Sequence, residues 1–185
     1  CGRTAYILLD EVIGSLQEIY RYAKETDNYN FVNSKKAESL TDEDTLLIIV
    51  DTHRPSYVEN STLLTMTDRI VVIDHHRKAE DYVENPTLSY IESYASSTAE
   101  LVSEILQYAA PKKTLIKLEA EALLAGMTID TNRFAVKTGV RTFEAAAWLR
   151  RSGADTAEVK RFFQTDLEAF KIRAKCIAAA NFHEK

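Results

Sequence analysis

The sequence has few of the residues that mark linkers, disulfide frameworks or membrane spans. Its 185 residues include five glycines, three prolines and two cysteines. So little Gly and Pro leaves hardly any room for a flexible linker. Cys1 and Cys176 form no spacing pattern, which fits a reducing cytoplasm and thiols rather than disulfides. No apolar run approaches the roughly 20 residues that cross a bilayer, so we expect no direct membrane contact from this chain.

The chain also lacks an excess of positive charge. Its net charge of −5 argues against binding of duplex nucleic acid, which usually requires a basic face. A small anionic substrate is still compatible with this charge, because bound divalent metals would reverse the local field. The 45% hydrophobic and 28% charged residues are ordinary values for a soluble globular protein.

Neither a start methionine nor a signal peptide opens the chain, which begins Cys-Gly-Arg-Thr. We therefore expect the sequence to be cut from a longer polypeptide. Its length suits one α/β domain or a domain with a small appendage.

The first half of the chain alternates strand and helix patterns. Apolar residues recur at helical spacing over residues 12–23, and a short helix is expected near residues 61–67. Strands are predicted at residues 4–9, 29–32, 45–50 and 69–73. The last two are continuous in large apolar side chains, as expected for strands covered on both faces. This alternation predicts an α/β fold, a mainly parallel sheet with helices on both faces.

The second half is predicted to be helical. Capping-box patterns and apolar periodicity place its helices over residues 97–109, 117–129, 142–152, 155 onward and 165–181. We therefore divide the chain into an α/β part, residues 1–110, and a helical part, residues 111–185.

Polar residues gather where the two clearest strands end. Asp-Thr-His-Arg follows the first at residues 51–54, and Asp-His-His-Arg follows the second at residues 74–77. Three of the four histidines of the chain lie in these two segments. Because the carboxyl ends of parallel strands line one crevice, both clusters are expected to face the same cleft.

Aspartate and imidazole together form a ligand set for manganese, iron, cobalt or zinc. A third candidate ligand is Asp130, which ends an otherwise apolar helix. An unpaired carboxylate buried there would be costly, and a metal would remove that cost.

Each of these residues also has a purely structural interpretation. Asp51 can cap the helix that follows its strand, and adjacent histidines are often a surface pair. Asp130 can be a helix-end residue bonded to Thr131 or Asn132. The order of the three motifs along the chain, each after the right kind of element, favours the metal site.

These motifs resemble those of the DHH phosphoesterase superfamily. The segment VIDHHR, residues 72–77, resembles the signature that names the superfamily, and IIVDTHRPS, residues 48–56, looks like its second motif. The second motif is particularly similar to that of cyclic-di-AMP phosphodiesterases of the GdpP/YybT type. MTIDTNRF at residues 127–134 and the helix that follows it, residues 141–155, resemble the fourth motif of this subfamily. The likeness extends over nearly the whole chain.

The resemblance implies a role for each motif residue. Asp51 would bridge two manganese ions, and His75 and Asp130 would complete the shell of the second ion. His76 would lie beside the substrate phosphate as a catalytic residue rather than a ligand. Asp74 would not bind the metal itself but would orient the tandem imidazoles through contacts with them.

Three arginines beside the motifs are candidates for binding phosphate together with His76. Arg54, Arg77 and Arg133 could each clamp phosphate oxygens. A solvated salt bridge is the alternative for each of them.

Two parts of the family pattern do not occur in this chain. The first motif, His-x-Asp-x-Asp, would supply three more metal ligands and is expected before residue 1. A DHH-associated domain is expected after residue 185. The resemblance further implies membrane-spanning, PAS-like and degenerate GGDEF segments upstream, with this part in the cytoplasm. Without the first motif, we expect the chain alone to bind metal weakly and to turn over little substrate.

The favoured hypothesis is a manganese-dependent hydrolase that opens cyclic di-AMP to linear pApA. One alternative is a nanoRNase-like hydrolase of short linear oligonucleotides. Another is a non-catalytic domain that senses a nucleotide in the same cleft. A homodimer is possible, because apolar faces of the C-terminal helices can pack within the domain or against a partner.

Overall fold

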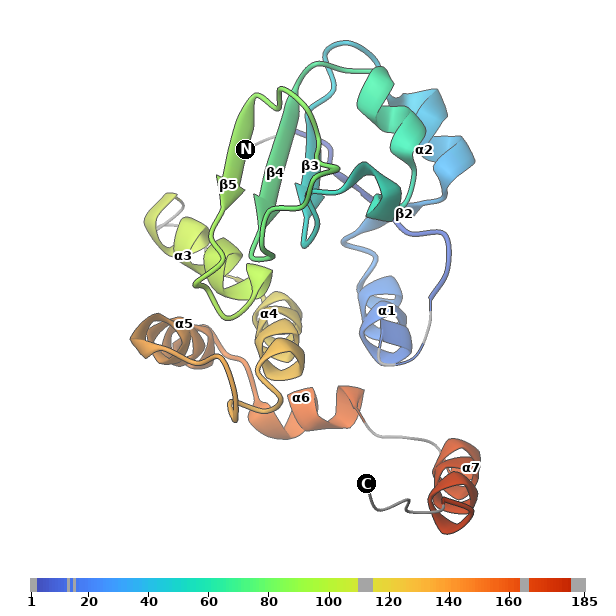
Figure 1. Ribbon diagram of the computed structural model, residues 1–185, viewed down its shortest axis with the longest axis vertical. Helices are drawn as coiled ribbons and strands as arrows, with labels where there is room; N and C mark the ends of the chain where they lie inside the picture. The colour runs from blue at the N-terminus through green and yellow to red at the C-terminus, as the bar shows by residue number, and fades with distance from the viewer. Residues whose placement is uncertain (1–2, 13, 15, 110–114, 164–166, 181–185) are drawn as a thin grey trace.

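The computed structural model describes residues 3–12, 14, 16–109, 115–163 and 167–180. Strands gather in one part of the molecule and the later helices in the other (Figure 1). None of the helices in these ranges is both long and apolar enough to cross a membrane.

All the strand pairs of the described residues are parallel. A two-stranded sheet joins β1 (Tyr6–Leu8) and β2 (Asn30–Val32). A three-stranded sheet has the order β3 (Leu47–Val50), β4 (Ile70–Asp74) and β5 (Leu88–Ile91). The parallel pairing expected from the alternating sequence pattern is therefore confirmed, although the five strands form two sheets, and four of the strands lie where the sequence predicts them.

The helices also follow the predicted segments closely. Their bounds are α1 (Leu16–Thr26), α2 (Ser34–Leu40), η1 (Pro55–Tyr57), η2 (Ser61–Thr65), α3 (Thr98–Ala109), α4 (Lys117–Asp130), α5 (Val140–Arg151), α6 (Thr156–Phe162) and α7 (Leu167–Ala178), where η denotes a 3-10 helix. The Asp155 side chain accepts a hydrogen bond from Ala157 N and so caps α6, as its capping-box pattern predicts. The expected cap of α7 at residues 165–166 lies outside the described residues.

A short strand and a short helix were not predicted. The strand β5 is only four residues long, and the helix α2 has the sequence SKKAESL, which contains little apolar periodicity. The cap of α2 is an asparagine, Asn33, whose side chain accepts from Lys36 N.

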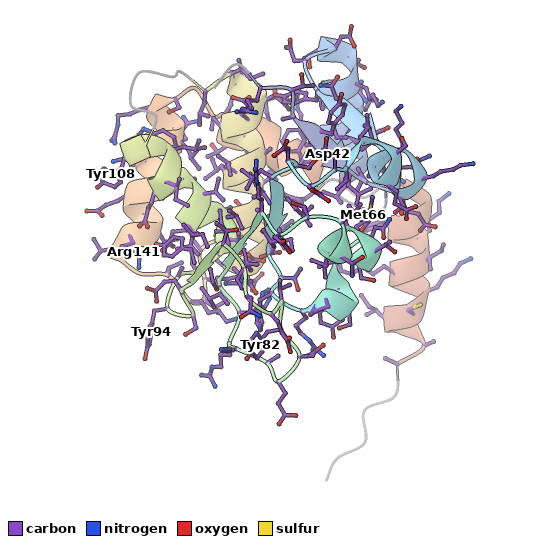
Figure 2. The ribbon with its side chains drawn as sticks, turned by 90° about the horizontal axis from the view of Figure 1, so that it is seen from above. Asp42, Met66, Tyr82, Tyr94, Tyr108 and Arg141 are labelled. Carbon is purple, nitrogen blue, oxygen red and sulfur yellow. The ribbon has the colours of Figure 1, made fainter. Side chains whose placement is uncertain are left out.

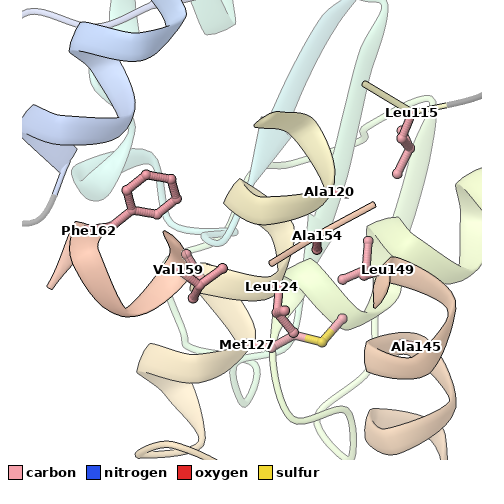
Figure 3. Close-up of a cluster of buried hydrophobic side chains, with 10 residues drawn as sticks. Leu115, Ala120, Leu124, Met127, Ala145, Leu149, Ala154, Val159 and Phe162 are labelled. Carbon is pink, nitrogen blue, oxygen red and sulfur yellow. The ribbon is translucent and has the colours of Figure 1, made fainter. Parts of the chain in front are cut away.

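Two separate apolar clusters hold the elements together. The larger lies among α4, α5 and α6 and includes Leu124, Met127, Leu149 and Phe162 (Figure 3). The smaller packs Ile49 of β3 and Val72 of β4 against side chains from the η1 and η2 region. Seen from above, the three-stranded sheet lies between α3 on one side and η1 and η2 on the other (Figure 2).

The expectation that both faces of β3 are covered is wrong. Ile49 is buried, but its neighbours Ile48 and Val50 are 55% and 52% exposed. The reason is topological: β3 pairs only with β4 among the described strands, and α3 packs against β4 rather than over β3. The continuous apolar run alone did not reveal that β3 lies at the edge of the described sheet.

Candidate metal centre

The two polar clusters meet because their strands are adjacent and in register. Val50 pairs with Ile73, and Asp51 N donates to Ile73 O at 3.0 Å. Asp51 and Asp74 therefore lie side by side at the carboxyl edge of the sheet. The convergence expected from the sequence is present in the structure.

Two candidate carboxylate ligands from separate stretches of the chain flank the imidazole of His75. His75 Nε2 lies 3.6 Å from Asp51 Oδ1 and 3.6 Å from Asp130 Oδ2. The His75 side chain is only 8% exposed, while Asp51 is 57% and Asp130 29% exposed. The arrangement presents two carboxylates and one buried ring nitrogen at a point that solvent reaches from the Asp51 side.

His76 lies as close to this point as a ligand would. Donor atoms of Asp51, His75 and His76 lie within 4.8 Å of one another, a grouping that could hold a metal ion. The His75 and His76 rings are 4.4 Å apart between centroids. The family resemblance implies that His76 contacts the substrate phosphate. Its position is compatible with that role and also with a role as a metal ligand.

The charges at this point favour a bound cation. Burial raises the pKa of Asp130, and the negative charge of Asp51 raises it further. The nearby His75, His76 and Lys137 offset part of that rise. Asp51 and Asp130 carry like charge on the same imidazole, and a divalent metal there would offset their repulsion. The oxygen and nitrogen donors present fit manganese, iron, cobalt or zinc.

Backbone strain is concentrated beside the candidate ligands. Asp51 has a φ of 65°, in the left-handed region that non-glycine residues rarely adopt. Asn132, Arg133 and Phe134, which closely follow Asp130, have φ values of 46°, 60° and 64°. Strained residues of this kind cost about 1–3 kcal/mol each and cluster at functional sites.

Hydrogen bonds hold the strained turn after α4. Arg133 N donates to Thr128 O at 2.7 Å, and Phe134 N donates to the Thr131 hydroxyl at 2.9 Å. The Thr131 hydroxyl donates in turn to Met127 O at 2.6 Å. These bonds fix the point at which α4 ends, and so place Asp130 at the sheet edge.

A second polar cluster at the same edge is centred on Asp74, which is fully buried. Its Oδ1 accepts from His76 N at 3.1 Å and lies 2.7 Å from His76 Nδ1. Its Oδ2 lies 2.5 Å from His53 Nδ1. Burial alone would raise the pKa of Asp74, but these bonds from His53 and His76 hold it below its usual value.

Asp74 therefore orients one of the two tandem imidazoles, and its second ring partner is His53 instead of His75. The contact with Nδ1 of His76 leaves Nε2 as the ring nitrogen available to the metal or the substrate.

His53 is a functional candidate to which the sequence motifs assign no role of its own. It is 2% exposed, and its Nε2 accepts from Ala79 N at 2.9 Å. Because Nε2 accepts, the proton lies on Nδ1, which donates to Asp74. His53 O also accepts from Val83 N at 2.8 Å. His53 thus connects the segment after the histidine pair to the end of β3. In the sequence, the only indication of this role is that His53 lies in the DTHR segment beside Asp51.

The three candidate arginines occupy different surroundings. Arg54 Nε lies 2.7 Å from Asp81 Oδ1, and its guanidinium stacks 4.5 Å from the centre of the Tyr57 ring. Arg133 lines a cavity of about 400 Å³ beside α4 and α6, together with Lys160. Arg77 lines a cavity of about 600 Å³ that also includes His75 and His76. Only Arg77, of these three, shares a cavity with the histidine pair.

The chain belongs to the DHH family. The model of the DHH family N-terminal domain matches residues 6–127. The resemblance that the sequence motifs carried is thereby confirmed.

Several curated relatives are similar over most of the chain. The cyclic-di-AMP phosphodiesterase GdpP of Bacillus subtilis is 41% identical over 180 residues, which are 95% of this chain and 27% of the relative. The cyclic-di-AMP phosphodiesterase PdeA of Listeria monocytogenes is 40% identical over 187 residues, 98% of this chain and 28% of the relative. A membrane protein–ribosomal subunit bL9 fusion protein of Onion yellows phytoplasma is 35% identical over 168 residues, 88% of this chain and 20% of the relative. The chain thus spans about a quarter of these proteins.

Among solved structures, an exopolyphosphatase-related protein from Bacteroides fragilis has the same fold. It superposes with a TM-score of 0.72 at 18% identity, covering 96% of this chain and 61% of that protein. This likeness supports the α/β fold.

Proposed function

We propose that the chain forms part of the catalytic site of a divalent-metal-dependent phosphodiesterase that hydrolyses cyclic di-AMP. The observation that carries this proposal is the convergence of Asp51 and Asp130 on His75 at 3.6 Å each. The choice of cyclic di-AMP as the substrate is supported by the GdpP and PdeA relatives, which are named as cyclic-di-AMP phosphodiesterases.

The metals would be two manganese ions, with Asp51 as the bridging ligand and His75 and Asp130 on the second ion. The 57% exposure of Asp51 supports a bridging role, since its carboxylate is accessible to a second cation. Further ligands would come from a His-x-Asp-x-Asp segment, which residues 1–185 do not contain. When bound, such a pair supplies a hydroxide near neutral pH and neutralises charge on the phosphate.

The residues of the chain would position the phosphodiester for that attack. Asp74 holds His76 through Nδ1, so His76 Nε2 can contact a phosphate oxygen or the leaving oxygen. Arg77 and Lys137 line the same cavity and would neutralise the remaining phosphate charge. Cleavage of one of the two phosphodiester bonds opens the ring, and the product is linear pApA.

Arg54 and Arg133 remain weaker candidates for phosphate contact. Arg54 already pairs with Asp81, and Arg133 lines the other cavity.

For the whole protein, we propose a membrane-anchored polypeptide with this domain in the cytoplasm. The phytoplasma relative named as a membrane protein supports the anchoring. A homodimer of the full-length protein is part of the same proposal, supported by the exposed apolar residues Phe170, Ile172 and Ile177 of α7.

The test is hydrolysis of cyclic di-AMP by the full-length protein with and without manganese. Wild-type protein should produce pApA only with metal, and Asp130→Asn should abolish production. Asp44→Asn removes an equally charged side chain that is 83% exposed and pairs with Arg69, so it should leave activity unchanged. Undiminished turnover by Asp130→Asn would contradict the ligand assignment.

Two comparisons separate the proposal from its alternatives. A preference for linear pApA over cyclic di-AMP in competition would favour a nanoRNase-like activity. Nucleotide binding without metal-dependent turnover would favour a sensing domain. Residues 1–185 assayed alone should turn over little or nothing, and robust hydrolysis by them would refute the proposed ligand count.

A further inference from the structure

The cavity beside the histidine pair has walls from three separate segments. About 600 Å³ in volume, it lies within the range of roughly 300–1,000 Å³ that is typical of ligand sites. It is lined by His75, His76, Arg77, Ser93, Tyr94, Ala95, Lys137, Thr138 and Gly139. One wall therefore carries the histidines, another carries a tyrosine, and the third carries a lysine.

The aromatic residue of this cavity is almost unpacked. Tyr94 is 93% exposed, and Figure 2 shows it projecting outward from the molecule. Other exposed tyrosines of the described residues have partners or lie elsewhere: Tyr57 stacks under Arg54, and Tyr108 lies on α3. Tyr94 combines a free ring face with a place in the cavity that holds His76.

The exposure of Tyr94 is not the result of a loose loop. The next three residues, Ala95, Ser96 and Ser97, are 5%, 1% and 0% exposed. Ala95 N donates to Glu92 O at 3.1 Å. Both the hydroxyl and the backbone N of Ser96 donate to Glu100 Oε2, at 2.6 and 3.3 Å. The segment that carries Tyr94 is therefore anchored in the interior on its C-terminal side.

The same buried carboxylate anchors the opposite wall. Glu100 is 2% exposed, and its Oε2 also accepts from the Thr142 hydroxyl at 2.7 Å. The Thr142 hydroxyl accepts from Gly139 N at 3.0 Å, next to Lys137 and Thr138. One carboxylate thus fixes the spacing between the tyrosine wall and the lysine wall.

We propose that Tyr94 is a platform on which a nucleobase of the substrate stacks while its phosphate lies at His76, Arg77 and Lys137. An aromatic ring on a fixed loop stacks on any base at low entropic cost, and the two cations match the adjacent phosphate. The ligand class is therefore a nucleotide, recognised by base and phosphate together. This inference rests on the proposed function, because that function places the phosphate at the histidines.

The test compares two ligands that differ only in the base. Adenosine 5′-monophosphate and ribose 5-phosphate carry the same sugar phosphate, so the difference in their affinities isolates the base. Binding to manganese-loaded full-length protein is measured by calorimetry for wild type, Tyr94→Ala, Tyr94→Phe and Tyr108→Ala. Tyr108 is 79% exposed on α3 and serves as the matched control.

The expected result is a selective loss. Tyr94→Ala should weaken adenosine monophosphate binding about tenfold, the size of one lost base–aromatic stack. Ribose 5-phosphate binding should not change, and Tyr94→Phe and Tyr108→Ala should bind both ligands like wild type.

Three results would overturn the inference. These are unchanged nucleotide binding by Tyr94→Ala, an equal loss of both ligands in that variant, or no binding of either ligand by wild type. An equal loss would show that Tyr94 supports the shape of the cavity or contacts another part of the protein. Tyr94-dependent binding in a protein that hydrolyses no cyclic di-AMP would sustain this inference and refute the proposed function.

Discussion

Two clusters of acidic and imidazole side chains lie at the same sheet edge, but only one of them is complete in itself. Around Asp74, both carboxylate oxygens accept hydrogen bonds, from His53 and His76, at 2.5–3.1 Å. Around His75, the carboxylates of Asp51 and Asp130 stand 3.6 Å from Nε2, beyond ordinary hydrogen-bond length. The first cluster satisfies its own charge, whereas the second gathers negative charge around one ring.

This difference separates supporting residues from candidate ligands. A buried carboxylate with two imidazole partners is stable without any ligand and can hold a ring in one orientation. Burial and the negative charge of Asp51 both raise the pKa of Asp130, so an added cation would stabilise this cluster with its carboxylates ionised. The comparison therefore predicts that substitutions in the second cluster act on metal binding, and substitutions in the first act on stability and ring orientation.

The largest effect is expected for Asp51→Asn, which removes the proposed bridging ligand. Loss of a residue that hydrogen-bonds to a metal ligand typically lowers metal affinity about 10- to 100-fold. Loss of a ligand itself should lower the affinity by more than that. Calorimetric titration of the full-length protein with manganese measures it. The melting temperature without metal should be close to that of wild type. An Asp51→Asn variant with a much lower melting temperature but an unchanged metal affinity would show that Asp51 contributes to stability and not to metal binding.

Asp74→Asn should show the opposite pattern. The amide cannot accept from both histidines, and a buried group left without its bond costs about 1–3 kcal/mol of unfolding free energy. Denaturant unfolding of metal-free protein measures this loss, and Asp44→Asn serves as the surface control. Stability equal to wild type would show that the buried network contributes little.

His53 offers a finer test, because its two ring nitrogens have different partners. His53→Asn keeps a donor near the Nδ1 position facing Asp74, and His53→Gln keeps an acceptor near the Nε2 position facing Ala79. If orientation of His76 through Asp74 matters most, His53→Asn should retain more activity, with a loss in His53→Gln of about tenfold in kcat. A smaller loss of kcat in His53→Gln than in His53→Asn would instead assign His53 to holding the segment around Ala79 in place.

The smallest effects are expected among the arginines. Arg77→Gln should raise KM for cyclic di-AMP about tenfold, because a charge-assisted phosphate contact is lost. Arg54→Gln should change KM little, because Arg54 pairs with Asp81 at a solvent-accessible site away from the cavity of the histidine pair. Steady-state kinetics of both variants shows which arginine contacts the phosphate. A larger rise in KM for Arg54→Gln than for Arg77→Gln would indicate that the phosphate binds near η1 instead.

Much of this edge was predictable from the sequence. The apolar runs before Asp51 and Asp74 identified two parallel strands, and parallel strands bring their carboxyl ends together. Asp130 was predicted because a carboxylate at the end of an apolar helix needs a partner. These inferences depend on local patterns and on one rule of topology.

The remaining features depend on distances that no local pattern contains. His53 pairs with Asp74 across 21 residues of chain, so its role required the register of β3 and β4. The pairing of Arg54 with Asp81 depends on a loop with no periodic pattern. The exposed face of β3 could not be read from its composition, because the run LLIIV is equally apolar at the edge and the centre of a sheet.

The most direct test is a crystal structure of the protein with manganese, with data collected for anomalous scattering. The account predicts an anomalous peak within coordination distance of Asp51, His75 Nε2 and Asp130. It also predicts that the contacts of Asp74 with His53 and His76 are unchanged. A peak elsewhere, or manganese-saturated protein without a peak at this point, would contradict the proposed metal centre.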